Sequence, residues 1–558
     1  MITIQPQYLS LSKLLDGRLF RIPEYQRAYS WTSKERTDLF GDIEKTFQKG
    51  DAGSHFLAAA VCLRQGKQEL GTDEYQIVDV VDGQQRLTTL IVLLKAVALA
   101  LDSAQKKEKK LQDELSELLV KPDSDELLLL QTNHDSSHYF SNYIRTGRSV
   151  PAAQAKTIAD REILGAIEDC RKYVLDWIAS GRELSPLASL LKNRLFILLH
   201  EIEDENSVYT VFEVLNSRGL DVSWIDRLKS ILMGNAFELK ATNQKGLISE
   251  LHKTWRDIYA TIGLRQGLST EALRFAATLY AKNLQSRSLG EKEAVELFRE
   301  SAKDAKGIRS TAQWLLQVAQ ACDTVTSRVR LNAVTRIVQA RLLAVAILLR
   351  DDLTDKEKES ILSRWEKVSF RIYGMLGNDA RTRVGEYVRL AWRVLHEKLS
   401  RKAIESAIHD IGLEFPIEDA VKNLSKTNCY DGWEPALRYF MFRYEEHLAA
   451  EEGLPFLNEQ WEKIWMVSPS DSIEHIWPKS KAPEKQKHRL GNLVLLPPRL
   501  NSKLQAKSPA EKAKSYRQTG LLIASEVADM IEAAKWDRNA IDEREEALLI
   551  WAAQEWAD

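Results

Sequence analysis

From about Trp224 to about Ser406, almost every segment has the apolar spacing of an amphipathic helix. Two examples are TRIVQARLLAVAILLR at 335–350 and EALRFAATLYAKNLQ at 271–285, and no fixed-period repeat joins them. The segments on either side have mixed character, and 558 residues are too many for one hydrophobic core. We therefore expect three parts: residues 1–235, a helical connecting region at 236–419, and residues 420–558.

The composition excludes several classes of protein. The apolar fraction of 44% and the charged fraction of 28% are those of a globular chain. A net charge of −2 excludes a uniformly basic protein that coats nucleic acid, so any DNA contact must come from local patches. The four cysteines are far apart and form no CxxC pair, which argues against a structural zinc site or a disulfide framework: Cys62, Cys170, Cys322 and Cys429.

The N-terminal sequence lacks the charged-then-apolar pattern of a signal peptide. The longest apolar run, from Leu87 to Leu101, contains Lys95 and is too short to span a membrane. Together with the cysteine usage, this predicts a cytoplasmic protein without a membrane partner.

A basic window lies near the C-terminus, between Asp471 and Gly520. It holds eleven Lys and Arg residues against four Asp and Glu residues, an unusual local excess in a slightly acidic chain. Such an excess is where phosphate contacts are sought, and Lys503 and Lys507 are candidates. The alternative is a solvated lysine-rich surface.

Within this window stand three short motifs: IEHIWP at 473–478, HRLGNLVLL at 488–496 and LNSK at 500–503. Phosphodiester hydrolysis needs a base that activates water, and the ordinary pKa of histidine suits that task. A carboxylate and an amide oxygen can bind a hard cation, and a second amide can hold the imidazole. One candidate set provides these groups: Glu474, His475, Asn492 and Asn501. The alternative for His475 alone is an ordinary core or surface histidine, and His488 could equally be structural.

A strand, a tight turn and a helix follow one another in the N-terminal part. YQIVDVV at 75–81 has strand composition, Asp82 and Gly83 form a turn signal, and helical spacing begins at Leu87. Phe196 to Ile202 is a second strand candidate. No GxxxxGK[ST] motif occurs, which excludes a P-loop NTPase. Helix N-terminal amides, Gly83 and Arg86 could bind phosphate, or the turn could simply reverse the chain.

Three N-terminal segments occur in a fixed order: RIPEYQRAYSW at 21–31, DGQQRLTTL at 82–90 and FEVLNSRG at 212–219. Together they resemble the GmrS-like domain of GmrSD-type restriction proteins over residues 1–235. EHIWP, GNLVLL and LNSK resemble the HNH, or His-Me finger, nuclease core of the same family over residues 420–558. The resemblance implies a predominantly helical α+β multidomain protein. Its N-terminal domain would have a ParB/sulfiredoxin-like α/β fold and its C-terminal domain a ββα-metal fold.

For the C-terminal part, the resemblance implies that His475 is the general base and that Asn492 orients it from the second strand of the ββα unit. Glu474 and Asn501 would hold Mg²⁺, with Mn²⁺ an alternative. The sequence departs from wider HNH enzymes in having Glu rather than Asp next to the histidine, and Asn rather than His in the third motif. Both replacements keep an oxygen donor, so the preference for a hard cation is retained.

For the N-terminal part, the resemblance implies binding and hydrolysis of ATP or GTP, with a metal, around the phosphates at one segment: Asp82, Gly83, Gln84, Gln85 and Arg86. The IPEYQR segment would lie beside it and bear on sensing modified DNA. There, Tyr25 and Trp31 could stack on a sugar or base or simply pack, and Arg27 could pair with phosphate. Gln26 is a further candidate for sensing DNA or for the nucleotide site. Asn216 and Arg218 could close the nucleotide site or form a helix C-cap turn.

The function implied is a nucleotide-dependent and metal-dependent DNA endonuclease, which nicks DNA or cuts both strands in anti-phage restriction of modified DNA. Its partner would be modified double-stranded DNA, with a homo-oligomer or companion defence proteins as further possibilities. Two alternatives remain open: a non-catalytic regulator switched by nucleotide, and a nuclease toxin. Loss of Glu474, His475 or Asn492 would favour the regulator, and all three are present.

Overall fold

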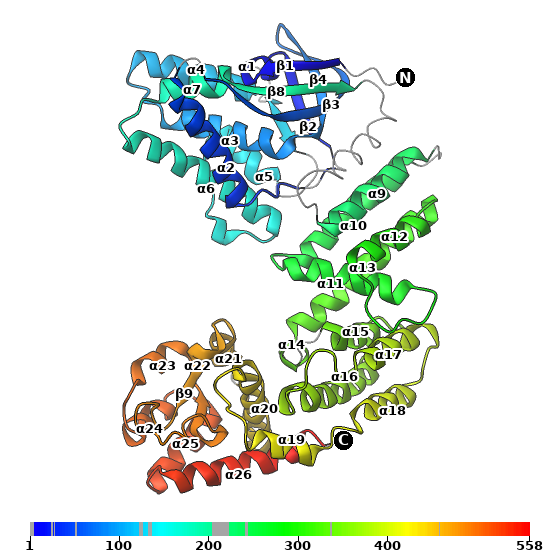
Figure 1. The fold of residues 1–558 in the computed structure, drawn as a ribbon, viewed down its shortest axis with the longest axis vertical. Coiled ribbons are helices and arrows are strands. Elements are labelled where there is room, and N and C mark those ends of the chain that lie inside the picture. The colour runs from blue at the N-terminus through cyan, green and yellow to red at the C-terminus, as the bar shows by residue number, and fades with distance from the viewer. Residues whose placement is uncertain are drawn as a thin grey trace. The chain divides into compact units, whose positions relative to one another are not determined.

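The computed structural model describes residues 5–23, 26, 28–50, 53–121, 126–131, 137–202, 223–239, 244–334, 338–456 and 458–557. The chain is 65% helical, with one mixed sheet near the N-terminus, as an α+β protein with several domains should be. The chain divides into two compact units, and the boundary between them lies within the predicted helical region. Unit 1 comprises Met1–Ala277 and Gly290–Gln320, and unit 2 comprises Thr278–Leu289 and Ala321–Asp558 (Figure 1).

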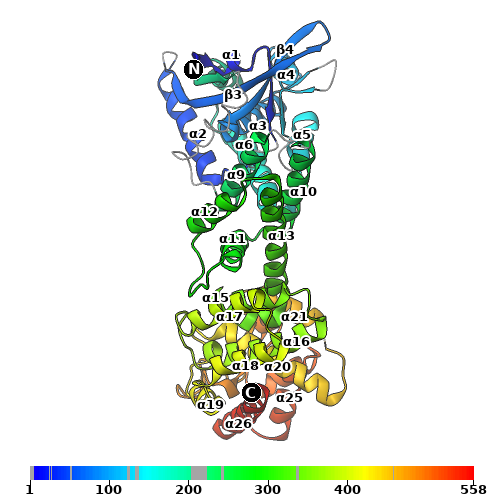
Figure 2. The ribbon, with the colours of Figure 1, turned by 90° about the vertical axis from the view of Figure 1, so that its right-hand side faces the viewer.

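The sheet of unit 1 has six strands and mixed directions (Figures 1 and 2). β1 and β8 are antiparallel, as are β3 and β4, whereas β3 with β8, β2 with β4 and β2 with β7 are parallel. In spatial order, the strands are β1 (Gln5–Ser10), β8 (Leu195–Ile202), β3 (His55–Leu70), β4 (Asp73–Asp82), β2 (Arg18–Ile22) and β7 (Leu129–Gln131). The two strands predicted from the sequence are therefore confirmed as β4 and β8.

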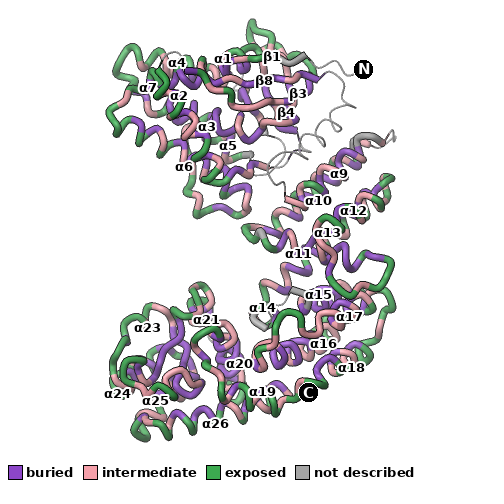
Figure 3. The backbone as a smooth tube through the Cα atoms, in the orientation of Figure 1, coloured by how far each residue is buried: buried purple, intermediate pink, exposed green. Residues whose placement is uncertain are grey.

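Helix α3 (Gln84–Ala100) is the central helix of unit 1. Most of its residues are buried, including several on every side, as expected of a helix enclosed by a core. It packs against α4 and α6, and Figure 3 shows the buried residues gathered inside the unit. The other helices of residues 1–202 are α1 (Leu11–Leu15), α2 (Ser33–Gln48), α4 (Lys106–Leu119), α5 (Ser137–Thr146), α6 (Ile158–Ala179) and α7 (Leu184–Asn193).

The predicted strand, turn and helix around Gly83 are confirmed: β4 ends at Asp82, Gly83 has φ 94°, and α3 begins at Gln84. A side chain added at Gly83 would lie 3.2 Å from the Cβ atom of Ala60 on β3. The close approach that this glycine permits is therefore to the neighbouring strand.

We expect Gly83→Ala to destabilise unit 1 by at least about 2 kcal/mol, because positive φ and the contact with Ala60 both oppose a Cβ atom. Gly17→Ala is the matched control, since Gly17 also has positive φ but a Cβ atom added there would meet nothing within 4 Å. Its expected cost is about 1 kcal/mol. Hydrogen exchange of the α3 amides measures the difference, and equal losses for both variants would show that the Ala60 contact costs nothing.

The predicted helical region is also confirmed. Its helices are α9 (Trp224–Glu238), α10 (Gln244–Ile262), α11 (Gln266–Tyr280), α12 (Glu291–Ser301), α13 (Ala305–Ser327), α14 (Val329–Val334), α15 (Val338–Leu348), α16 (Asp355–Ser369), α17 (Val384–His396) and α18 (Arg401–Gly412). A π-helical segment at Phe370–Met375 directly follows α16. Among the helices of the described residues, none is long and apolar enough to cross a membrane.

The C-terminal part of unit 2 surrounds an aromatic core. Phe440 and Trp556 pack at 5.2 Å between ring centroids, and Trp551 lies edge-on to both rings. Around this core lie α19 (Ile417–Leu424), α20 (Glu434–Glu452), α21 (Asn458–Trp465), α22 (Pro469–Ser472), α23 (Pro498–Leu504), α24 (Pro509–Arg517), α25 (Leu522–Ala533) and α26 (Arg538–Glu555). A two-stranded sheet of β9 (Ile473–His475) and β10 (Leu493–Leu495) lies among them.

A buried glutamate on α20 holds the start of α25. The Glu445 carboxylate accepts hydrogen bonds from the backbone N–H groups of Leu522 and Ile523, both at 2.8 Å. These amides lie at the helix N-terminus and have no partner within the helix. Burial raises the pKa of Glu445 to about 7, against the opposing effect of the two hydrogen bonds.

This pKa predicts a stability that falls with rising pH. Because the folded-state pKa lies above the ordinary value of 4.5, the contribution of Glu445 is complete below pH 4.5 and is lost as the pH rises through about 7. The loss amounts to about 3 kcal/mol. We expect Glu445→Gln to flatten the pH dependence of the stability of α25 between about pH 5 and 8, measured by hydrogen exchange after correction for the intrinsic exchange rate. The exposed Glu459→Gln should leave it unchanged, and an unaltered dependence in Glu445→Gln would contradict the assignment.

Candidate functional site

The three C-terminal motifs fold into a hairpin followed by a helix. β9 and β10 are antiparallel, with His475 opposite Leu493 and Glu474 opposite Val494. Both strands are buried, as the apolar run LVLL requires. Pro497 and Pro498 end the second strand, since proline offers no N–H to a ladder and suits the first helical position. Helix α23 then carries Asn501 back towards β9.

His475 lies at the end of β9 and is only 6% exposed. Its Nε2 atom lies 3.0 Å from Nδ1 of His488, and the ring of Tyr430 contacts it edge-on at 4.7 Å between centroids. Burial lowers the pKa of His475 to about 3, with Lys479 and His488 adding smaller effects in the same direction. The imidazole is therefore neutral near pH 7, which is the form that can accept a proton, although this pKa makes it a weaker base than an ordinary histidine.

Asn492 stands immediately before β10 and its side chain is completely buried. Its Oδ1 atom accepts a hydrogen bond from the backbone N–H of Trp477 at 2.8 Å. Its Nδ2 atom donates to the carbonyl oxygens of Trp477 and Lys487, at 3.1 and 3.0 Å. The amide thus holds the chain on both sides of the loop that joins β9 to β10. Any orienting effect on His475 is transmitted through this backbone.

Glu474 precedes His475 in β9, so its side chain leaves the opposite face of the strand. Its carboxylate forms a buried ion pair with Lys512 of α24 at 2.5 Å, and the Tyr516 hydroxyl donates to it at 3.4 Å. Burial raises the pKa of Glu474, and Lys512 opposes that shift. Lys512 also donates to the carbonyl oxygen of His475 at 2.7 Å. From the sequence, Lys512 was only one of the charges in the basic window, because no local sequence pattern shows that a lysine is buried.

Asn501 anchors α23 to the start of β9. Its Nδ2 atom donates to the carbonyl oxygens of Asp471 and Ile473, at 2.9 and 3.1 Å. Those bonds use the amide nitrogen and leave the oxygen as an acceptor. Lys503 and Lys507 are exposed, so their ammonium groups are accessible to phosphate. Across the described residues, no group of three His, Cys, Asp or Glu side chains forms a metal site.

The N-terminal candidate segment is partly occupied by internal hydrogen bonds. The Oε1 atom of Gln85 accepts from the backbone N–H of Ser30 at 2.9 Å, and its Nε2 atom donates to the carbonyl of Ala28 at 3.2 Å. Gln26 donates from Nε2 to the carbonyl of Val81 at 2.8 Å and is 2% exposed. Gln84 is also buried. These amides fasten the segment before α2 to the end of β4 and the start of α3.

Arg86 lies in the first turn of α3, and within the described part of unit 1 it forms no ion pair. Its guanidinium lies 5.8 Å from the ring centroid of Trp31. Burial lowers the pKa of Arg86, and Asp82 opposes this shift. Trp31 is only 7% exposed, so in this conformation it packs in the core of unit 1. The remaining candidates of this region lie outside the described residues: Tyr25, Arg27, Asn216 and Arg218.

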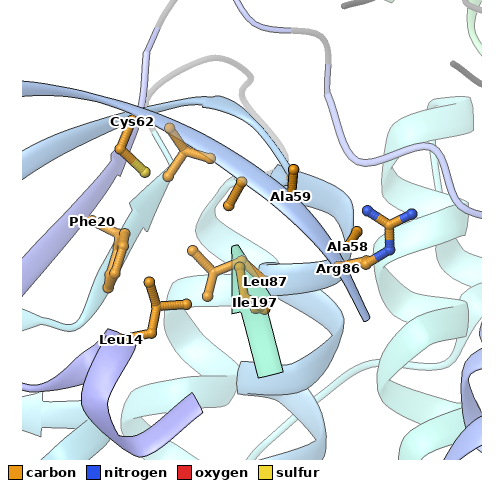
Figure 4. A pocket seen from close by; sticks show the side chains of 11 residues that line it. Leu14, Phe20, Ala58, Ala59, Cys62, Arg86, Leu87 and Ile197 are labelled. Carbon is orange, nitrogen blue, oxygen red and sulfur yellow. The ribbon is translucent and has the colours of Figure 1, made fainter. Parts of the chain in front are cut away.

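A small apolar cavity lies between the sheet and the start of α3. Figure 4 shows Leu14, Phe20 and Leu87 around it, and the Arg86 guanidinium pointing away from them. The space open to a water-sized sphere is about 10 Å³, which is about enough for one water molecule. A nucleotide base does not fit there, so a nucleotide would have to bind outside this cavity, near Arg86.

Two comparisons identify the class of protein. Residues 11–233 match the family described as GmrSD restriction endonuclease, N-terminal domain. Residues 416–551 match the family described as GmrSD restriction endonucleases, C-terminal domain. Both descriptions name a restriction endonuclease. The chain therefore belongs to the GmrSD-type restriction endonuclease family, within type IV restriction, and the predicted family is confirmed. No curated protein matches the chain.

Proposed function

We propose that this restriction endonuclease cuts double-stranded DNA that carries modifications, in defence against phage, and that both a nucleoside triphosphate and a divalent metal are required. The observation that carries the cleavage mechanism is the neutral, buried His475 at the end of β9, in a hairpin followed by α23. The order of two antiparallel strands and a helix supports a ββα-metal fold of the HNH type for the C-terminal part. The six-stranded mixed sheet supports a ParB/sulfiredoxin-like fold for the N-terminal part.

In the proposed reaction, His475 accepts a proton from a water molecule. The hydroxide oxygen forms a bond to phosphorus, the bond from phosphorus to the leaving sugar oxygen breaks, and that oxygen takes a proton from solvent. Asn492 holds the loop after His475 rigid, so the imidazole keeps one position during the reaction. Lys503 and Lys507 contact DNA phosphates and position the strand.

Glu474 and Asn501 supply the oxygen donors that Mg²⁺ or Mn²⁺ prefers. The chemistry of this pair fits such an ion: Asn501 uses its amide nitrogen for the backbone and keeps its oxygen as an acceptor. Lys512 binds one oxygen of Glu474, so a metal would have to share this carboxylate with an ammonium group. Because the Glu474 side chain leaves β9 on the face opposite His475, it would have to turn away from Lys512 to hold an ion beside the base. An ion bound there would stabilise negative charge on the phosphate.

The start of α3 is the proposed nucleotide site, for ATP or GTP. Unpaired amides at a helix N-terminus attract anions, and Arg86 adds a cation that forms no ion pair with a described carboxylate. Asp82 provides a carboxylate for a metal bound to the phosphates, and Gly83 shapes the turn. Gln84 and Gln85 contribute as buried residues at the start of α3. The Gln85 side chain fixes the neighbouring segment through hydrogen bonds to the backbone of Ala28 and Ser30.

We expect Arg86→Gln to weaken nucleotide binding by about 10- to 100-fold, since an ionic hydrogen bond to phosphate contributes about 1.5–3 kcal/mol. Lys95→Gln is the matched control, because Lys95 lies on the same helix about 13 Å further along. Titration with a fluorescent ATP or GTP analogue measures the affinity. Equal affinities for Arg86→Gln and the wild type would remove Arg86 from the nucleotide site.

The test of the function is a cleavage assay with the full chain. Unmodified plasmid and DNA with modified cytosines or phosphorothioate linkages are incubated with Mg²⁺ or Mn²⁺, with and without ATP or GTP. We expect cutting of modified DNA that requires nucleotide and stops with EDTA, and gel products that distinguish nicks from double-strand breaks. Equal cutting of all DNA without nucleotide would indicate a toxin. Nucleotide hydrolysis without any cutting would indicate a regulator, or the need for a companion protein or an oligomer.

A further inference from the structure

His488 lies beside the proposed general base, in the chain between β9 and β10. Its Nδ1 atom is 3.0 Å from Nε2 of His475, and the two rings are steeply inclined at 74°. A neutral imidazole has one N–H donor and one acceptor nitrogen. Two lone pairs facing each other at this distance would repel, so one of the two nitrogens must carry the hydrogen.

The surroundings of His488 decide which nitrogen that is. Its Nε2 atom faces Oδ2 of Asp431 at 3.8 Å, and an ionised carboxylate favours an N–H group on that side. The Asp431 carboxylate is itself held by a hydrogen bond from Nδ2 of Asn428 at 3.0 Å. With hydrogen on Nε2, the Nδ1 atom of His488 becomes an acceptor. The Nε2 atom of His475 must then be the donor.

The loop at 428–431 also fixes the position of His488. Its ring stacks on Tyr430 at 5.1 Å with an interplanar angle of 13°, and Lys479 lies 3.5 Å above the centroid of the Tyr430 ring. Its backbone carbonyl accepts a hydrogen bond from the N–H of Cys429 at 3.0 Å. Although the side chain is near the surface at 16% exposure, contacts with the loop at 428–431 hold it in place.

We propose that His488 is a positioning residue that selects the tautomer of His475, with Asp431 selecting the tautomer of His488. This inference rests on the role proposed for His475 as the base. In the selected tautomer, Nε2 of His475 donates to His488 and Nδ1 carries the lone pair. The Nδ1 atom has no hydrogen-bond partner among the described residues, so it is the nitrogen that meets water. When Nδ1 accepts the proton, the bond from Nε2 to His488 is kept and the ring does not turn.

Two substitutions separate this role from simple packing. His488→Asn places an amide oxygen near the position of Nδ1 and keeps an acceptor for His475, whereas His488→Leu fills the space without one. We expect His488→Leu to lower kcat by about 10- to 100-fold, with the KM for DNA unchanged. His488→Asn should recover most of the rate, and Asp431→Asn should lower it by about threefold to tenfold. A residue that only packs would tolerate Leu better than Asn.

The tautomer itself is measured by ¹⁵N NMR of the full chain with labelled histidine, using His475→Ala to assign the signals. We expect wild-type His475 to carry hydrogen on Nε2 and none on Nδ1, and His488→Leu to show a mixture. A His475 with hydrogen on Nδ1 in the wild type, or a kcat of His488→Leu equal to that of wild type, would overturn the proposal. Because the NMR measurement does not depend on cleavage, a failure of His475 as the base would appear separately, as cutting by His475→Ala.

Discussion

Replacing His475 with alanine is expected to lower the rate of DNA cleavage by about 10²- to 10⁴-fold, the usual contribution of a general base. The imidazole is neutral because burial lowers its pKa. Nucleotide binding should be unchanged, since the proposed nucleotide site lies in unit 1. The measurement is single-turnover cleavage of modified DNA, with nucleotide affinity measured on the same preparation.

His447→Ala is the matched control, because it removes an imidazole from α20 of the same unit without touching the hairpin. Its cleavage rate should stay near that of the wild type. Circular dichroism and the thermal transition show whether each variant is folded. If folded His475→Ala, free of contaminating nuclease, cuts DNA at the wild-type rate, another group is the base.

Replacing Lys512 with methionine is expected to destabilise the hairpin region by about 3–5 kcal/mol, because an uncompensated buried charge costs about this amount. The methionine keeps most of the apolar stem, but Glu474 is left as a buried carboxylate without its partner. The carbonyl oxygen of His475 also loses a hydrogen bond donor. Hydrogen exchange of peptides spanning residues 473–496 measures the loss.

The double variant Lys512→Met with Glu474→Gln should recover much of this stability, because it removes both charges together. The exposed Lys514→Met, on the same helix α24, should change stability by less than about 0.5 kcal/mol. If Lys512→Met and Lys514→Met behave alike, the ion pair does not form in solution. Glu474 would then be free for a metal without competition from Lys512.

Several elements could be predicted because their cause is local. Helical apolar spacing identified the region from Trp224 to Ser406, and the Asp82–Gly83 turn marked the junction of β4 with α3. Four strands of the six-stranded sheet were not predicted: β1, β2, β3 and β7. β3 is long, but its second half, RQGKQEL at 64–70, is polar and lacks strand composition. It is stabilised by pairing with β4 on one side and, in its first half, with β8 on the other.

The candidate site shows the same division. The motifs at 473–478, 488–496 and 500–503 were recognised because the residue types needed for hydrolysis stand at short spacings. The side chains that surround them come from distant parts of the chain. Lys512 reaches Glu474 from α24, and Tyr430 and Asp431 reach His488 from the loop before α20. No spacing rule predicts such contacts, since they depend on how helices pack around the hairpin.

By itself, the sequence determined the helical middle region, the strand and turn before α3, the family, and the residue types of the hydrolytic motifs. These follow from periodicity, turn chemistry and short-range order, which act within a few residues. Only the tertiary structure decided the partner of each polar group. Gln85 hydrogen-bonds to Ala28 and Ser30, Glu474 forms an ion pair with Lys512, and His475 contacts His488. A buried polar group needs a partner of the right geometry, and the fold supplies that partner from residues far away in the chain.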